Sequence, residues 1–140
     1  MIRVCPRCGT KNRVPARHLA HVGRCGSCHA ELPPLAEPLD VDAATFDEVV
    51  KASPVPVLVD FWAPWCAPCR QAAPQVQQLA SDMAGRALVL KVNTEDVPAL
   101  AQRFGVHGIP AFVVLRDGRV VRQSVGLTDR REMAQWLAAA

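Results

Sequence analysis

Hydrophobic and polar positions are patterned differently in two parts of the chain. From residue 39 onward, short apolar runs alternate with segments whose apolar residues recur at helical spacing. The runs PVLVDF (56–61) and ALVLKVN (87–93) are rich in β-branched residues, which is typical of buried strands. Residues 1–31 show no long apolar period, so a hydrophobic core of their own is not expected to fold them.

The segments between and after these runs predict helices. Thr45 and Glu48 are spaced like a capping box, which would open a helix that runs to about Ala52. A longer helix is expected at about 66–84, where Pro74 should introduce a kink. Two further segments complete the set: a short helix at 97–104 and a C-terminal amphipathic helix with Met133, Trp136 and Leu137 on one face.

The segment 111–125 predicts a β-hairpin, because two apolar runs flank the turn-forming pair Asp117-Gly118. Strands that alternate with helices and then end in a hairpin predict an α/β fold, a mixed central sheet with helices on both faces. The prolines of LPPLAEP (32–38) favour an extended spacer ahead of this domain. We therefore expect a small module at 1–31, a linker at 32–38 and the main domain at 39–140.

The N-terminal module holds two cysteine pairs with metal-ligand spacing. Sixteen residues separate Cys5-x2-Cys8 from Cys25-x2-Cys28, which predicts one structural Zn²⁺ held by four thiolates. Metal binding would supply the folding energy that the segment lacks. Gly9 and Gly26 are expected to provide the backbone freedom of the two knuckles. Two alternatives stay open: the pairs could be redox dithiols, or a histidine could replace one thiolate as ligand (His18, His21 or His29).

The charge distribution does not predict a nucleic-acid-binding protein. Residues 1–31 carry six basic side chains against one acidic, whereas 32–140 carry ten against twelve. Four thiolates around a divalent metal contribute about −2, which offsets much of the excess, and no aromatic residue is interleaved to stack on bases. The sequence has neither a leader pattern nor an apolar run long enough to span a bilayer, so we expect a cytoplasmic protein without a membrane partner.

The third pair, Cys66 and Cys69, follows a buried strand and stands where a helix begins. The unpaired N–H groups and positive dipole end of a helix N-terminus stabilise a thiolate at Cys66. Cys69, one turn later, could then attack a mixed disulfide formed at Cys66. A metal knuckle is the alternative, but no second pair adjoins this strand. A C-x-x-C motif in a βαβ setting predicts redox chemistry.

The stretches VLVDFWAPWCAPCR and GIPAFVVLRDG resemble thioredoxins, and the resemblance covers residues 39–140. CPRCGTKNRVP followed by CGSC resembles the N-terminal zinc module of zinc-containing thioredoxins, the thioredoxin 2 class. Together they imply a thioredoxin fold preceded by a small zinc-ribbon-like module.

The resemblance also implies roles for individual residues. Cys66 would be the attacking cysteine and Cys69 the buried resolving one. Asp60, with Lys91 nearby, would accept the proton of Cys69; a lone carboxylate in an apolar strand should indeed have a raised pKa. Trp62 would pack beside the site as a structural residue. The substrate-binding surface would comprise Trp65, Ala67, Pro68, Ile109, Gly126 and Pro110, the last as a cis-proline.

The function implied is a cytoplasmic, monomeric protein-disulfide reductase that receives electrons from NADPH through thioredoxin reductase and acts on disulfide-containing proteins. Ala67 departs from the glycine usual in this loop, and the dipeptide between the cysteines tunes the redox potential. A disulfide isomerase or oxidant is therefore a second hypothesis. A third is a zinc-dependent holdase, in which the basic module would hold client proteins and the dithiol would regulate it.

Overall fold

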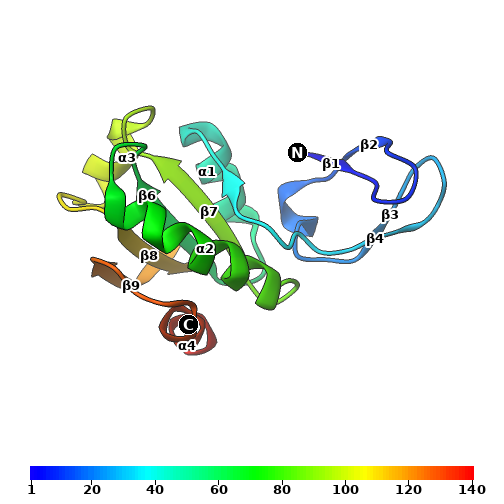
Figure 1. Cartoon of the computed structure of the whole chain (residues 1–140). Helices are drawn as coiled ribbons and strands as arrows, with labels where there is room; N and C mark the ends of the chain where they lie inside the picture. The colour runs from blue at the N-terminus through cyan, green and yellow to red at the C-terminus, as the bar shows by residue number, and fades with distance from the viewer.

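The computed structural model describes residues 1–140 and has a five-stranded mixed sheet with a small module beside it (Figure 1). In spatial order its strands are β5 (Leu39–Asp40), β7 (Leu88–Asn93), β6 (Val57–Trp62), β8 (Ala111–Arg116) and β9 (Arg119–Val125). Strands β5 and β6 run parallel to β7, β8 runs antiparallel to β6, and β9 runs antiparallel to β8.

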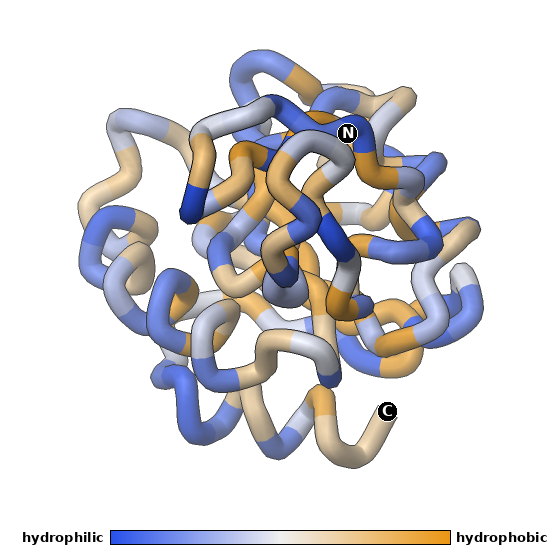
Figure 2. Tube along the Cα trace, turned by 90° about the vertical axis from the view of Figure 1, so that its right-hand side faces the viewer, coloured by the Kyte–Doolittle hydropathy of each residue, from blue (hydrophilic) through white to orange (hydrophobic).

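Helices cover both faces of the sheet, as the sequence predicts. Helices α1 (Ala43–Ala52) and α3 (Pro98–Arg103) lie on one face, and α2 (Ala67–Asp82) and α4 (Arg130–Ala138) on the other. Successive strand residues point to opposite faces. Val59 and Phe61 therefore join the core under α1, whereas Leu58 joins the core under α2. In Figure 2 hydrophobic segments gather inside and hydrophilic ones outside. None of the helices combines the length and hydropathy of a bilayer-spanning segment.

Helix α1 begins earlier than predicted, so the proposed capping box is wrong. Asp42 is the N-cap residue, and its Oδ1 accepts the N–H of Thr45 at 2.8 Å. Thr45 thus lies inside the first turn, where its N–H needs an acceptor. The sequence offers two acceptable caps three residues apart, and spacing alone does not choose between them.

The hairpin and the proline-containing helix form where they were expected. Asp117 and Gly118 connect β8 to β9 with φ values of 52° and 77°. A two-residue turn with both central residues in the left-handed region matches the right-handed twist of the flanking strands. Helix α2 continues past Pro74 and ends at Asp82.

The N-terminal module consists of two short hairpins, each with a cysteine pair in its turn. Strands β1 (Ile2–Val4) and β2 (Lys11–Arg13) form the first hairpin, and β3 (Gly23–Arg24) and β4 (Glu31–Leu32) form the second. A 3-10 helix, η1 (Ala16–His18), connects the two. These elements are too short to show a hydrophobic period.

The module is also folded onto the core of the main domain, which the sequence did not predict. Leu19 is buried in the same cluster as Phe46 and Val49 of α1, together with Ala16 and Ala20. Leu35, within the proline-rich segment, joins that cluster, and its N–H donates to the Leu19 carbonyl at 2.8 Å. Apolar packing therefore contributes to the folding of residues 1–31, in addition to any metal.

Candidate functional site

Cys66 lies where strand β6 has ended and helix α2 is about to begin. It is the N-cap residue of α2, and its Sγ accepts the N–H of Cys69 at 3.2 Å. Pro68, in the first turn, has no N–H that would need a partner there. The predicted position at a helix N-terminus is therefore observed, and the local backbone field favours negative charge on Cys66 Sγ.

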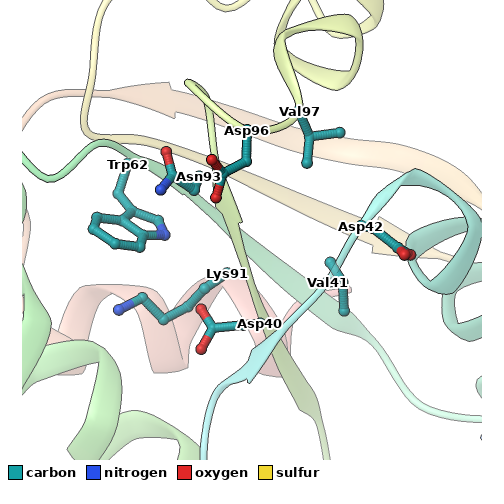
Figure 3. Close-up of a pocket in the computed structure, with 8 residues that line it drawn as sticks. All are labelled: Asp40, Val41, Asp42, Trp62, Lys91, Asn93, Asp96 and Val97. Atoms are coloured by element: carbon teal, nitrogen blue, oxygen red, sulfur yellow. The ribbon is translucent and has the colours of Figure 1, made fainter.

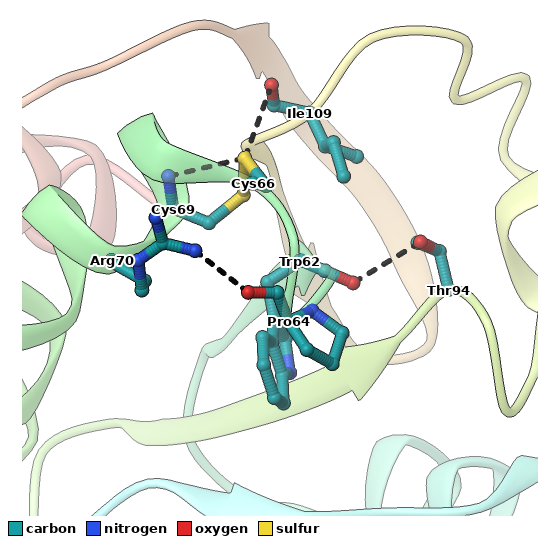
Figure 4. The surroundings of a disulfide bond; sticks show 7 residues. All are labelled: Trp62, Pro64, Cys66, Cys69, Arg70, Thr94 and Ile109. Carbon is teal, nitrogen blue, oxygen red and sulfur yellow. Dashed lines mark hydrogen bonds between the residues drawn. A yellow bond between two sulfur atoms is a disulfide. The ribbon is translucent and has the colours of Figure 1, made fainter.

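Cys66 and Cys69 form a disulfide, and their Cα atoms lie 5.2 Å apart (Figure 4). The two residues are almost equally buried, with exposed fractions of 3% and 4%. They pack with Ala63 and against Trp62 and Ile109. Cys69 is buried as the resemblance implies, and in this oxidised state Cys66 is buried to nearly the same extent. Cys66 differs from Cys69 in its position, because Cys66 is the N-cap residue of α2 whereas Cys69 lies within the helix.

The loop opposite the disulfide presents a free backbone donor. The Ile109–Pro110 peptide bond is cis, as the resemblance implies. The Ile109 carbonyl oxygen lies 3.8 Å from Cys66 Sγ (Figure 4). The Ile109 N–H donates to no protein acceptor. An extended peptide could pair with this backbone beside the sulfurs.

The other residues predicted for the substrate surface surround this loop or the start of α2. Trp65 is 65% exposed, and Ala67 and Pro68 are exposed at the first turn of α2. Gly126 donates its N–H to the Pro110 carbonyl at 2.8 Å and has a φ of 103°, which favours glycine. Their role in binding substrate remains a prediction.

Asp60 is a buried carboxylic acid on the face of the sheet that α2 covers, two residues after Leu58. It is 2% exposed, and its Oδ1 has no hydrogen-bond partner. Burial raises the pKa of Asp60 to about 7, the positive charge of Lys91 opposes this rise, and the negative charge of Asp40 adds to it. Asp60 can therefore exchange a proton near neutral pH.

Lys91 lies directly across from Asp60 on the neighbouring strand, but it forms no ion pair with that residue within 4 Å. Its Nζ lies 4.5 Å from the centre of the Trp62 ring. A cavity of about 410 Å³ opens beside these two side chains (Figure 3); it is lined by Asp40, Val41, Asp42, Trp62, Lys91, Asn93, Asp96 and Val97. Trp62 packs beside the site as predicted, and its Nε1 has no partner.

The four cysteines of the N-terminal module converge on one point. The Sγ atoms of Cys5, Cys8, Cys25 and Cys28 all lie within 4.8 Å of one another. The Cys5–Cys28 pair is separated by 3.7 Å and the Cys8–Cys25 pair by 3.6 Å. A tetrahedral ion with metal–sulfur bonds of about 2.3 Å would require sulfurs about 3.8 Å apart, so these residues fit a Zn²⁺ site. No histidine belongs to the cluster.

The two knuckles have the same backbone pattern. In the first knuckle, the Gly9 N–H donates to the Cys5 carbonyl oxygen at 3.0 Å. In the second, the His29 N–H donates to the Cys25 carbonyl oxygen at 3.0 Å. Gly9 and His29 both have positive φ, 77° and 61°. The expectation that Gly26 supplies this conformation is wrong, because the left-handed position follows the second cysteine of each pair.

Polar groups inside the module stabilise a thiolate at Cys25. The backbone N–H groups of Cys28 and Ser27 and the Asn12 side chain lower the pKa of Cys25 to about 6. Asn12 Nδ2 lies 3.5 Å from Cys25 Sγ, and Asn12 Oδ1 accepts the N–H of Gly26 at 2.9 Å. Asn12, on strand β2, therefore connects the first hairpin to the second knuckle, a role with no recognisable signal in the sequence.

Comparison with known protein families accounts for both parts of the molecule. The family model described as Thioredoxin matches residues 37–139, and the one described as Thioredoxin 2, N-terminal, matches residues 4–30. The chain belongs to the thioredoxin family. It is a thioredoxin-type disulfide oxidoreductase with an N-terminal zinc-ribbon domain whose four cysteines are positioned to bind a metal.

Individual thioredoxins support this assignment. Thioredoxin C-3 of Corynebacterium nephridii is 39% identical over 137 residues, which cover 98% of this chain and 93% of that protein. A thioredoxin of Haemophilus influenzae is 38% identical over 103 residues, 74% of this chain and 96% of its own length. The structure of a mutant thioredoxin from Halobacterium salinarum superposes with a TM-score of 0.70 at 36% identity, over 75% of this chain and 91% of that one.

Sequence reasoning missed Asp40 at this thioredoxin site. Asp40 belongs to β5, an edge strand of two residues that has no visible period. It faces Lys91 only because of the strand register. The only feature of the sequence that could have indicated Asp40 is its position as an acidic residue shortly before the first helix.

Proposed function

We propose that this thioredoxin is a protein-disulfide reductase, in which Cys66 attacks and Cys69 resolves. The observation that carries the proposal is the Cys66–Cys69 disulfide at the N-terminus of α2, beside the Ile109 backbone, whose N–H is unpaired. This arrangement combines an activated sulfur with a backbone edge that can hold an extended polypeptide. Trp65, Ala67, Pro68 and Gly126 would form the surrounding surface.

In the first step of the reduced enzyme, the Cys66 thiolate attacks one sulfur of a substrate disulfide. A bond forms between Cys66 and that sulfur, the substrate disulfide breaks, and the other substrate sulfur leaves as a thiolate. The helix terminus stabilises the attacking thiolate. The Ile109 N–H would orient the substrate chain beside it.

In the second step Asp60, as carboxylate, takes the proton of the Cys69 thiol. The Cys69 thiolate attacks Cys66 Sγ and releases the second substrate thiolate, which regenerates the Cys66–Cys69 disulfide. Two electrons have then passed from the enzyme dithiol to the substrate, and the substrate thiolates take up protons from solvent and Asp60. The pKa of Asp60, raised to about 7 by burial, suits this exchange.

We infer that thioredoxin reductase, using NADPH, returns two electrons to the disulfide, as the family resemblance implies. We also infer that Cys5, Cys8, Cys25 and Cys28 hold one structural Zn²⁺, whose bonds would fasten the two knuckles together. Thiolates free to bind metal persist in a reducing compartment, which supports a cytoplasmic location. The proposed units are 1–31 for the zinc module, 32–38 for the linker and 39–140 for the thioredoxin domain, acting as a monomer.

The two active-site cysteines should behave differently when each is replaced. Cys66→Ser should abolish reduction of insulin by NADPH and thioredoxin reductase, because no attacking sulfur remains. Cys69→Ser should accumulate a covalent complex with insulin that dithiothreitol dissolves, because nothing resolves it. The complex is counted on a non-reducing gel. Turnover by Cys66→Ser, or trapping by Cys66→Ser but not by Cys69→Ser, would contradict the assigned order.

The redox potential decides between the reductase and the isomerase or oxidant. We expect a value near roughly −270 mV, which is characteristic of a thioredoxin that reduces its substrates. It can be followed by tryptophan fluorescence in redox buffers, since Trp62 packs against the disulfide. Ala67→Gly is the matched variant for the departure in the loop. A potential near about −180 mV would instead support an isomerase or oxidant.

A further inference from the structure

Three charged side chains lie in one row across the sheet. Lys91 on β7 is directly opposite Asp60 on β6 and directly opposite Asp40 on β5. Residues paired in this way on neighbouring strands point to the same face of a sheet. The register therefore places Lys91 between a buried residue, Asp60, and an exposed one, Asp40, although its Nζ lies over the Trp62 ring and forms no ion pair with either carboxylate within 4 Å. Figure 3 shows Asp40 beside the Lys91 side chain, and both residues line the cavity.

We propose that Asp40 is a positioning residue for proton transfer, whose negative charge acts on Asp60 from two strands away in the same row and opposes the effect of Lys91. Asp40 is exposed, whereas ionisation of Asp60 must overcome burial. Burial is the main reason that the pKa of Asp60 is raised; the positive charge of Lys91 opposes this rise, and the negative charge of Asp40 adds to it.

No other group near Asp60 duplicates this effect. On its own strand the next residue on the same face is Trp62, and β8 places Phe112 opposite it. Helices α2 and α4 present apolar side chains to this face, apart from the Cys66–Cys69 pair. Asp42 and Asp96 line the cavity but lie outside the row, and Asp42 is engaged in capping α1.

The inference rests on the proposed role of Asp60, but its test does not require turnover. The Asp60 carboxyl carbon is titrated by ¹³C NMR in the oxidised protein. With Asp40→Asn the midpoint should move to lower pH by about half a pH unit, since a like charge two strands away is removed. Asp40→Glu should restore it. Asp96→Asn, which removes an exposed carboxylate from the same cavity outside the row, should shift it far less.

Equal shifts for Asp40→Asn and Asp96→Asn, or no shift for Asp40→Asn, would overturn the proposal. The pH dependence of single-turnover insulin reduction provides the functional readout: its acidic limb should move to lower pH in Asp40→Asn by the same amount as the NMR midpoint. An NMR shift without movement of that limb would confirm the coupling but refute the assigned role of Asp60. Persistence of the limb in Asp60→Asn would refute that role independently of Asp40.

Discussion

Asp60 affects the stability of the molecule as well as its chemistry. Its pKa is about 7 in the folded protein, because burial disfavours the carboxylate, and 3.8 is the ordinary value that applies to the unfolded chain. Between these two pH values the folded state binds more protons than the unfolded state. The free energy of unfolding therefore falls as pH rises from about 4 to about 7 and stays reduced above that. An acid placed for proton transfer is thus a local cost to folding.

We expect Asp60→Asn to stabilise the oxidised protein at pH 8.5 and to have little effect at pH 4. The gain at pH 8.5 should be a few kcal/mol, with an upper limit of about 4 kcal/mol set by the difference between the two pKa values. Urea unfolding at the two pH values measures it. A gain of the same size at both pH values would show that Asp60 titration is not the cause.

At the scale of elements, the N-terminus of α1 depends on one side chain. Asp42 Oδ1 accepts the Thr45 N–H, and the hydrogen bonds to Thr45 lower the pKa of Asp42. Glu48, by contrast, makes no hydrogen bond or ion pair at this terminus. Helix α1 contributes Phe46 and Val49 to the core cluster. Fraying of its first turn would therefore weaken a helix that packs against both the sheet and the N-terminal module.

Asp42→Ala should lower the free energy of unfolding by about 1 kcal/mol, the usual cost of losing an N-cap side chain. Asp42→Asn should retain most of the stability, because an amide oxygen can also accept the bond. Glu48→Gln serves as the control for the capping box and should change little. A larger loss for Glu48→Gln than for Asp42→Ala, in denaturant titrations at pH 7, would reinstate the capping box.

The elements that the sequence predicted well are those with a local signal. Strands β6 and β7 and the hairpin at Asp117-Gly118 follow from β-branched runs and turn chemistry, and Cys66 and Cys69 follow from their motif after a strand. Elements of two or three residues, such as β5 and those of the module, are too short to carry a period. Asp40 was missed because its importance comes from pairing with a residue 51 positions away.

At the scale of the molecule, the zinc module and the thioredoxin domain share one apolar core. Leu19 and Leu35 belong to the same buried cluster as Phe46 of α1. The turn after α2, at Gly85, faces Pro34 and the Ala20 carbonyl. The module therefore packs near the C-terminal end of α2, while the disulfide lies at its N-terminal end. The N-terminal module and the disulfide therefore lie towards opposite ends of that helix (Figure 1).

Leu19→Ala should destabilise the thioredoxin domain as well as the module. The buried Leu19 side chain is 1% exposed, so its truncation should cost about 2–5 kcal/mol. Val22→Ala is the control, because Val22 lies in the same module but is 58% exposed. The signal is the fluorescence of Trp62 and Trp65, which report on the main domain during urea unfolding. An unchanged midpoint for Leu19→Ala would show that the two parts fold independently.

The shared core also limits how this architecture can change over generations. Thioredoxins such as that of Haemophilus influenzae match only 74% of this chain. A deletion of the first 38 codons would not simply produce such a protein, since it would remove Leu19 and Leu35 from the buried cluster that holds Phe46 and Val49 of α1. Substitutions that compensate for these lost contacts would have to arise with the deletion or before it. The module is therefore tied to the fold of the main domain, independently of any metal that its cysteines bind.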